Sequence, residues 1–375
     1  MYTTPSDSLR GHVRLACVPG IGSRLRRLLL EQFGSPEAVF QADPAELQRV
    51  ARLGPKLAQE IPSHATSTAA DDVLDLCAAR DIDIMLEGEP RYPGLLSRID
   101  DPPGLLFVRG QMQPADSLAV AIVGARHATA YGIRAAEQLA GGLARAGYTV
   151  VSGLARGIDA AAHRGALKAG GRTLAVLGSG VLSIYPPEHE DLADEVIANG
   201  AILSELPPRC EPNQATFPQR NRIVSGLSLG VVVVQASERS GALITARLAG
   251  EQGREVFAVP GPIDCRVSRG CHALIRDGAK LVENVDDVLE EIGPLFETCT
   301  APDGRQVQHA AELQLGDIEK RVLDAVAARG ADEPVAIDDL VVDTNLAASQ
   351  VLATIGVLEM RRLLRRHPGS RVSRV

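Results

Sequence analysis

Runs of glycine and serine that directly follow β-branched stretches are the residues of this sequence best suited to chemistry. One such run, Ser152-Gly153, follows residues 149–151, and its turn continues through Gly157 to an alanine-rich segment that opens at Asp159. A strand, a tight turn and a helix N-terminus in succession direct backbone N–H groups and the positive end of a helix dipole at one place. The pattern predicts a phosphate-binding turn, although many turns of α/β proteins serve packing alone.

Three further turns have the same chemical character. Each follows an apolar run, and they are Gly124-Ala125-Arg126 after 118–123, Gly178-Ser179-Gly180 after 173–177, and Ser240-Gly241 after 230–234. Ser240 is a natural helix N-cap. Because the carboxyl ends of parallel strands meet at one edge of a sheet, the four turns together predict a trough whose backbone amides bind anions.

A second dense stretch combines an aromatic residue with cationic and amide side chains. Phe217 is followed by Arg220, Asn221 and Arg222, which we expect on a single turn. Arginine grips phosphate through two parallel hydrogen bonds, and a phenylalanine ring stacks on a base. We interpret the stretch as a binding element; the alternative is that Arg220 and Arg222 cap strand ends or pair with carboxylates.

The sequence lacks the signatures of several enzyme classes. Gly124 starts no G-x-G-x-x-G, no Walker-type Gly-Lys-Ser/Thr is present, and no nucleophile can be assigned a histidine partner. His163 is expected to be a packed histidine. The six cysteines are scattered without a Cys-x-x-Cys pair, so reduced thiols are favoured over a metal site. We therefore expect no metal, no cofactor and no catalytic residue.

Strands and helices alternate through the middle of the chain. The apolar runs that read as strands are 118–123, 149–151, 173–177, 201–203, 230–234, 255–259 and 280–282. Near-continuous apolar runs are typical of strands buried on both faces of a parallel sheet, and helical segments separate them. The predicted fold class is α/β, an extended Rossmann-like, mostly parallel, doubly wound sheet.

The flanks predict smaller domains. We expect a small all-helical N-terminal domain over 1–65, a proline-rich connector over 66–104, the Rossmann-like domain over 105–293, a linker over 294–312 and a winged-helix domain over 313–375. The glycine turns of the first domain resemble helix-hairpin-helix turns, and DNA binding and packing are equally favoured there. The basic C-terminal tail leaves DNA binding and partner binding open.

Composition bounds the function. A net charge of −8 argues weakly against a nucleic-acid binder, and 3% aromatic residues argue against a broad base-stacking platform. No window of about 18 apolar residues and no targeting segment occurs, so we expect a cytoplasmic protein without membrane contact.

Taken together, five motifs in order resemble the DNA-processing protein A (DprA/Smf) family. They run from Ser152 to His163, from Val176 to Glu188, from Phe217 to Ser228, from Ser240 to Ala246 and from Val256 to Gly261. The resemblance covers the whole α/β region, and the flanks agree with the family's helical and winged-helix domains.

The resemblance implies a non-enzymatic mediator that binds and protects incoming single-stranded DNA during natural transformation and loads the RecA recombinase onto it. It also implies a homodimer formed through the Rossmann-like domains. The residues implied to bind DNA are Gly124, Arg126, Ser152, Gly153, Gly157, Gly178, Ser179, Gly180, Phe217, Arg220, Asn221, Arg222, Ser240 and Gly241. Gln214, Gln235 and Ala242 depart from the family pattern, where Lys, an acid and Ser are found.

Two alternatives from other classes remain. One is a nucleotide-processing enzyme like the phosphoribohydrolases, but Pro260-Gly261-Pro262 lacks their Pro-Gly-Gly-x-Gly-Thr turn. The other is a winged-helix regulator that senses a nucleotide in its core, which would prefer duplex over single-stranded DNA.

Overall fold

Two compact units make up the chain, and each is built from segments that are discontinuous in sequence. The computed structural model describes residues 7–292, 299–300, 306–307, 315–329, 334–360 and 363–374. The first unit comprises Met1–Gln111, Gly153–Ala155 and Leu174–Leu227, and the second comprises Met112–Ser152, Arg156–Thr173 and Ser228–Val375. The domain boundaries expected at 65, 104, 293 and 312 remain predictions.

A large, mostly parallel sheet confirms the predicted fold class. Within the described ranges, nine strands follow the order β1-β2-β6-β5-β4-β3-β7-β8-β9. Their bounds are β1 Ile82–Leu86, β2 Leu105–Gly110, β3 Ala119–Val123, β4 Thr149–Ser152, β5 Thr173–Val176, β6 Gly200–Ser204, β7 Gly230–Val233, β8 Glu255–Ala258 and β9 Lys280–Leu281. β3 pairs in parallel with β4 and β7, and β7–β8 and β8–β9 are also parallel, whereas β1–β2 and β2–β6 are antiparallel.

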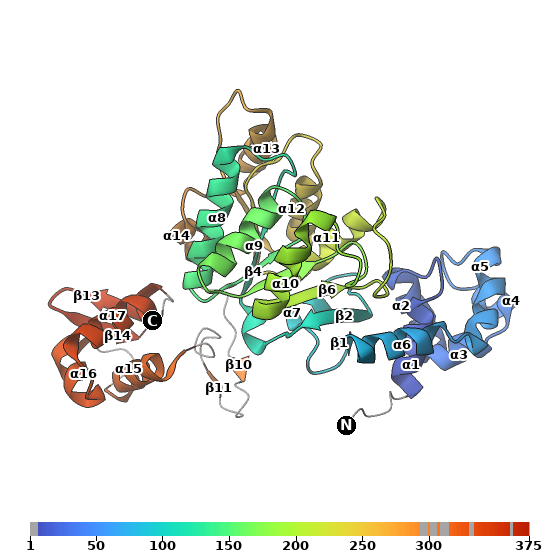
Figure 1. Ribbon diagram of the computed structural model, residues 1–375, viewed down its shortest axis with the longest axis horizontal. Helices are drawn as coiled ribbons and strands as arrows, with labels where there is room; N and C mark the ends of the chain where they lie inside the picture. Colours follow the sequence, from blue (N-terminus) through green and yellow to red (C-terminus); the bar gives the residue numbers. More distant parts are fainter. Residues whose placement is uncertain are drawn as a thin grey trace. The chain divides into compact units, whose positions relative to one another are not determined.

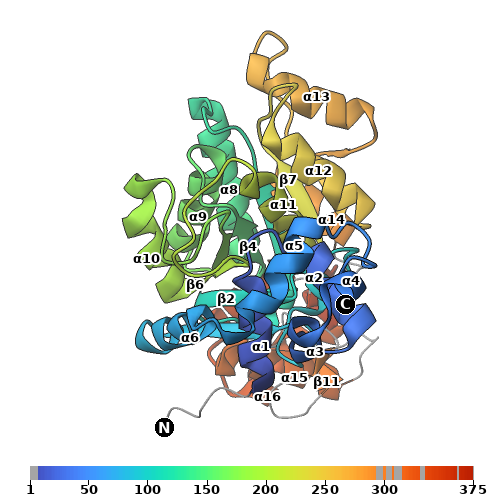
Figure 2. The ribbon, with the colours of Figure 1, turned by 90° about the vertical axis from the view of Figure 1, so that its right-hand side faces the viewer.

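Short helices with their own core open the first unit (Figure 1). They are α1 Asp7–Ala16, α2 Ser23–Phe33, α3 Pro36–Gln41, α4 Pro44–Leu47, α5 Pro55–Glu60 and the 3-10 helix η1 Ile61–Thr66. Ser35 and Asp43 cap α3 and α4, and proline occupies the first turn of each. Leu15, Leu29 and Ile61 are fully buried in their core, so these helices form the all-helical region that the sequence predicts. In Figure 2 they lie together in blue.

The rest of the first unit carries the β1–β2–β6 pairing and its helices. These helices are α6 Ala69–Ala79, α7 Gly94–Ser97, η3 Pro187–His189, α10 Glu190–Asn199 and α11 Thr216–Gly226. The segment expected to be a connector therefore contributes β1 to the sheet, with Ile84 opposite Phe107 of β2.

The second unit contains the parallel strands, their helices and the C-terminal module. Its helices are η2 Pro114–Ser117, α8 Ala130–Arg145, α9 Ile158–Lys168, α12 Gly241–Glu251, η4 Arg266–Ser268, α13 Arg269–Arg276, α14 Val285–Ile292, α15 Asp317–Ala328, α16 Ile337–Thr344 and α17 Ala348–Met360. α8 and α9 lie side by side (Figures 1 and 2). Their close approach requires glycine at position 165, because a Cβ atom there would lie only 2.5 Å from the carbonyl oxygen of Glu137. Every residue of β3 is buried, as expected for a strand covered on both faces.

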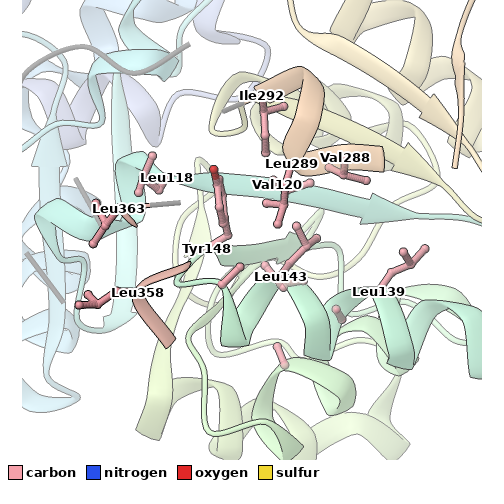
Figure 3. Packing of buried hydrophobic residues seen from close by; sticks show 14 of the residues in the cluster. Leu118, Val120, Leu139, Leu143, Tyr148, Val288, Leu289, Ile292, Leu358 and Leu363 are labelled. Carbon is pink, nitrogen blue, oxygen red and sulfur yellow. The ribbon is translucent and has the colours of Figure 1, made fainter. Parts of the chain in front are cut away.

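Side chains from β3, α8 and α14 belong to one apolar cluster of the second unit. Figure 3 shows Val120 of β3 near Leu143 of α8 and Leu289 of α14. Val120 and Leu143 have no exposed surface, and Leu289 keeps 3%. This packing fixes the β3 strand that precedes the Gly124 turn.

The C-terminal module has the predicted winged-helix order. Three helices, α15 to α17, precede the hairpin of β13 Leu364–His367 and β14 Arg371–Arg374, and β12 Val335–Ala336 pairs with β14. Arg361 and Arg362 of the basic tail lie outside the described residues. So does most of the expected 294–312 linker, of which the short antiparallel strands β10 Cys299–Thr300 and β11 Gln306–Val307 are described.

The described residues contain neither a cluster suited to a metal ion nor a single membrane-spanning helix. In them, no cluster of three or more His, Cys, Asp or Glu side chains has the geometry of a metal site. No single helix in these ranges has the length and apolar character to cross a membrane; α16 and α17 meet that standard only jointly, with a bend of 112°.

Candidate functional site

The turn after β3 is held against the start of α9. Gly157, the N-cap of α9, has φ +75°, and a Cβ atom there would lie 2.3 Å from the carbonyl oxygen of Ala125 and 2.7 Å from that of Arg126. The amide of Ile158 donates to the Ala125 carbonyl at 3.2 Å. Only glycine accepts both this backbone conformation and this approach. The second unit thus brings the predicted residues Gly124, Arg126 and Gly157 together, with the Arg126 side chain exposed.

Ser152 fixes the sheet below this turn. Its side chain has no exposed surface, and its hydroxyl donates to the carbonyl of Ile122 at 2.6 Å. A Cβ atom on Gly124 would lie 2.6 Å from the Ile158 side chain and 2.9 Å from the carbonyl oxygen of Gln235. Ser152 and Gly124 therefore shape the turn through packing, and the buried Ser152 hydroxyl is not presented to a ligand.

Gln235, which follows β7 and departs from the family pattern, connects the same turn region to the end of that strand. Gln235, only 1% exposed, accepts from the Thr129 amide at 2.9 Å and donates to the Thr129 hydroxyl at 2.8 Å. That hydroxyl caps α8 by accepting from the Gly132 amide. The departure from the family pattern at position 235 signalled this residue, but its partner lies too far along the chain to be found from sequence.

The N-terminus of α12 matches the prediction for Ser240. The Ser240 hydroxyl accepts from the Ala242 amide at 3.2 Å. Gly241 is exposed, and the space where its Cβ atom would stand is open to at least 4 Å. The second unit thus presents an exposed, capped start of an 11-residue helix.

In the first unit, the turn after β5 is tightly packed, and two of its donors form hydrogen bonds within the protein. The Gly180 amide donates to the Cys210 carbonyl at 2.8 Å, and the buried Ser179 hydroxyl donates to the Ser183 carbonyl at 2.6 Å. A Cβ atom on Gly180 would lie 2.2 Å from the carbonyl oxygen of Pro207. Because its amide is bonded to the Cys210 carbonyl, Gly180 cannot offer that amide to a ligand. Glycine is needed at this position because the backbone of Pro207 packs directly against it.

Phe217 and Asn221 lie in the helix that follows. The expectation of a single turn is wrong, because α11 spans Thr216–Gly226. The Thr216 hydroxyl donates to the Gly178 carbonyl, and a Cβ atom on Gly178 would lie 2.8 Å from the Phe217 ring. The ring centroids of Phe217 and Tyr185 lie 5.8 Å apart with a 45° tilt. The first unit thus brings Gly178 and Phe217 into contact beside a second half-buried aromatic ring.

The two arginines of α11 take up internal partners. Arg220 is 6% exposed, donates from Nη1 to the Val176 carbonyl at 2.6 Å and crosses Gly153, where a Cβ atom would lie 1.7 Å from that nitrogen. Arg222 pairs with Glu205, with 2.6 Å between Nη2 and Oε2. These are the strand-capping and carboxylate-pairing roles of the alternative interpretation.

A histidine stabilises the backbone after Gly153. Leu154 has a left-handed backbone with φ +57°, and the Nδ1–H of the buried His189 donates to its carbonyl at 2.8 Å. Conformations of this kind in a branched residue persist only where the surroundings enforce them. Nothing in the sequence links His189 to Leu154. As predicted, His163 is fully buried and lies 2.7 Å from the Thr173 hydroxyl through Nδ1.

The architecture defines a Rossmann-like α/β protein with glycine-rich turns at its strand ends and appended helical and winged-helix modules. Comparison with known families identifies it further. The chain belongs to the DNA recombination-mediator protein A family, whose sequence model matches residues 83–293. The DprA winged-helix domain matches residues 306–370, and a SAM-like helix-hairpin-helix tandem matches residues 14–65.

Individual relatives agree with this assignment. Protein Smf of Synechocystis sp. is 34% identical over 387 residues, which cover 95% of this chain and 96% of that protein. The X-ray structure of DprA from Streptococcus pneumoniae has a TM-score of 0.65 at 34% identity and covers 78% of this chain and 99% of its own. The structure of DNA processing protein A from Helicobacter pylori, which describes its single-stranded DNA binding mode, has a TM-score of 0.52 at 30% identity. The match covers 58% of this chain and 97% of that one.

Proposed function

We propose that this protein binds single-stranded DNA and acts in natural transformation as a mediator that protects the strand and loads RecA onto it. The observation that carries the proposal is the contact of the Phe217 ring with Gly178 at the end of β5. An aromatic ring beside a small-residue turn suits a base and its phosphate at once. The likeness to the Helicobacter pylori protein, studied for its single-stranded DNA binding mode, supports the same role.

The proposed contacts fall into two sets, one in each unit. In the first unit, Phe217 stacks on a base, Asn221 contacts the strand, and Gly178 and Ser179 offer backbone amides to a phosphate. In the second unit, Arg126 pairs with a phosphate, while the start of α12 at Ser240 and Gly241 attracts a phosphate through the positive end of its helix dipole. The other predicted residues shape these surfaces: Gly124, Ser152, Gly153, Gly157, Gly180, Arg220 and Arg222.

A base-removal experiment tests the stacking role. We expect Phe217→Ala to weaken binding to labelled poly-dT by about 1–3 kcal/mol per stacked base. The same substitution should leave binding to an abasic strand of equal length unchanged, because the phosphates are the same. Val342→Ala, at a residue of the winged-helix module that is 78% exposed, is the control. Equal losses on both strands would contradict the stacking role.

Loading of RecA has its own assay. We expect the protein to shorten the lag of RecA ATPase activity on poly-dT that is covered with single-strand-binding protein. A Phe217→Ala variant that binds the strand weakly should restore the lag. A lag that the wild type leaves unchanged would contradict the loading role without affecting the DNA-binding proposal.

The proposed homodimer would use the Rossmann-like part of the second unit. β9 ends the strand order, both of its residues are exposed, and Leu281 is 40% exposed. Exposed sheet edges and apolar side chains are features that partner chains cover. We expect Leu281→Arg to convert the wild-type dimer to a monomer by analytical ultracentrifugation. A wild type that sediments as a monomer would contradict the dimer.

A further inference from the structure

Arg222 lies at the centre of a polar network that joins α11 to the N-terminal helices of the first unit. Its Nη2 lies 2.6 Å from Glu205 Oε2 and donates to the Ser23 hydroxyl at 2.8 Å, and its Nε lies 3.4 Å from Asp101 Oδ2. The Ser23 hydroxyl in turn donates to Asp101 at 3.1 Å. Ser23 is the first residue of α2, so a single guanidinium connects three separate segments of the chain.

The charge of Arg222 is used within this network. Its side chain is 11% exposed, against 16% for Glu205 and 32% for Asp101. Burial raises the pKa of Glu205, and the Arg222 guanidinium opposes that shift. Two carboxylates thus surround one guanidinium in a poorly solvated place, where a charge-assisted pair is strong. A DNA phosphate would have to displace an anionic partner to reach it.

The first turns of α2 make further contacts with the segment that precedes β2. The Arg26 guanidinium lies over Gly104, where a Cβ atom would stand 1.2 Å from its Nη1, and Arg27 donates to the Asp100 carbonyl. Arg26 also donates to Nδ1 of His12 at 2.6 Å. α2 is therefore attached at Ser23, Arg26 and Arg27 to residues 100–104.

The same segment supports the end of α11. A Cβ atom on Gly226 would lie 2.8 Å from the Leu96 side chain and 3.2 Å from that of Ile99. At its other end, α11 carries Phe217 against Gly178. An α-helix transmits displacement along its length because its backbone hydrogen bonds make it stiff. The position of Phe217 thus depends on how α11 is held at Arg222 and Gly226.

We propose that Arg222 is a positioning residue, and that docking of the N-terminal helices through Arg222, Ser23 and Arg26 holds α11 so that Phe217 meets the DNA base. This inference rests on the proposed single-stranded DNA binding and extends it to a helical module with no DNA contact of its own in the scheme. Loosening that module therefore weakens DNA binding from a distance.

Salt dependence separates positioning from direct contact. For single strands, each neutralised phosphate contributes roughly 0.7 to the slope of log affinity against log salt. We expect Arg222→Gln to lower poly-dT affinity several-fold with the slope unchanged, whereas Arg126→Gln lowers the slope. The double variant Arg222→Glu with Glu205→Arg should recover part of the affinity that Arg222→Glu alone loses, because the ion pair is restored with its charges exchanged. A slope that falls for Arg222→Gln as it does for Arg126→Gln would overturn the positioning role.

A glycine pair tests the coupling to the helical module. Gly104→Ala forces the Arg26 guanidinium away, while Gly94→Ala, in the same segment, adds a methyl group to open space. We expect Gly104→Ala to lower poly-dT affinity several-fold and to speed tryptic cleavage near Arg24 and Arg27, with Gly94→Ala like the wild type. Circular dichroism should confirm that both remain folded. Unchanged poly-dT affinity in Gly104→Ala would overturn the coupling; absence of binding by the wild type would instead overturn the proposed function.

Discussion

Gly157 is the residue at which the turns of the second unit are most restricted. It combines a positive φ with an approach of 2.3 Å between its would-be Cβ atom and the Ala125 carbonyl oxygen. Gly170 has a similar φ of +71° but no atom within 4 Å of that position. Gly157 therefore combines a backbone conformation of φ +75° and ψ −120° with a close contact, whereas Gly170 lacks the contact.

We expect Gly170→Ala to lower the free energy of unfolding by about 1 kcal/mol, the usual cost of a left-handed non-glycine residue. Gly157→Ala should cost about 2 kcal/mol more, because the ψ of −120° at Gly157 lies outside the left-handed region and because the turn after β3 must also move. Urea unfolding followed by circular dichroism measures both. Equal losses in the two variants would contradict the special restriction at Gly157.

The roles of individual side chains were only partly predictable. Ser240 acts as the predicted N-cap because capping depends on neighbours two residues away. Arg220 and Arg222 could not be assigned from sequence, because their partners Val176 and Glu205 are distant along the chain. An arginine has the same pattern whether it pairs with a phosphate or with a carboxylate.

At the scale of elements, a buried ion pair connects the segments around β4. Arg172, just before β5, donates to both oxygens of Asp116 at 2.9 Å, and the Thr149 hydroxyl donates to the same carboxylate at 2.9 Å. Asp116 lies in η2 and its side chain is 2% exposed. This carboxylate therefore holds η2, the start of β4 and the residue before β5 together.

Removing one partner of such a pair leaves an uncompensated buried charge. We expect Asp116→Ala to lower the free energy of unfolding by about 3–5 kcal/mol. The double variant Asp116→Ala with Arg172→Met should recover part of that loss, since neither charge remains. Chemical denaturation of the three variants gives the coupling energy. A double variant less stable than Asp116→Ala would contradict this account of the pair.

Element prediction succeeded at most long apolar runs and failed next to prolines. The seven predicted strands are all present, as are the helices and hairpin of the C-terminal module. β2 was not predicted, because it follows the proline cluster. α11 was expected as a turn, because its Pro218-Gln219-Arg220-Asn221 start hides a helix whose buried face includes two arginines.

At the scale of the molecule, the stability of the first unit should depend on pH through His12. Burial, assisted by the nearby Arg26 charge, lowers the pKa of His12 from 6.5 to about 4. Between these values the unfolded chain binds more protons at His12 than the folded chain. Stability is therefore complete above pH 6.5 and falls as the pH falls toward 4.

We expect this single group to contribute about 1–3 kcal/mol to the loss of stability between pH 7 and pH 4. His12→Gln lacks the titration and should show a smaller loss, because all other groups are unchanged. Urea unfolding of both proteins at the two pH values measures the difference. Identical losses would contradict the lowered pKa.

The arrangement into two discontinuous units is the feature least accessible from sequence. The chain passes from one unit to the other at Gly153 and again at Arg156. Local patterns report which residues form a strand or a turn, but they do not report which segments pack together. The predicted trough therefore rested only on the turns at the ends of strands. Its residues are proposed as two separate contact surfaces, one in each unit.

The central claim is that this family member binds single-stranded DNA, and a competition titration tests it most directly. Labelled poly-dT is bound to the wild-type protein and displaced by unlabelled poly-dT or by a duplex of equal length, across a salt series. The account predicts that poly-dT competes more strongly than the duplex, with a modest salt slope that Arg126→Gln reduces. Stronger competition by the duplex, or no binding of poly-dT, would contradict it.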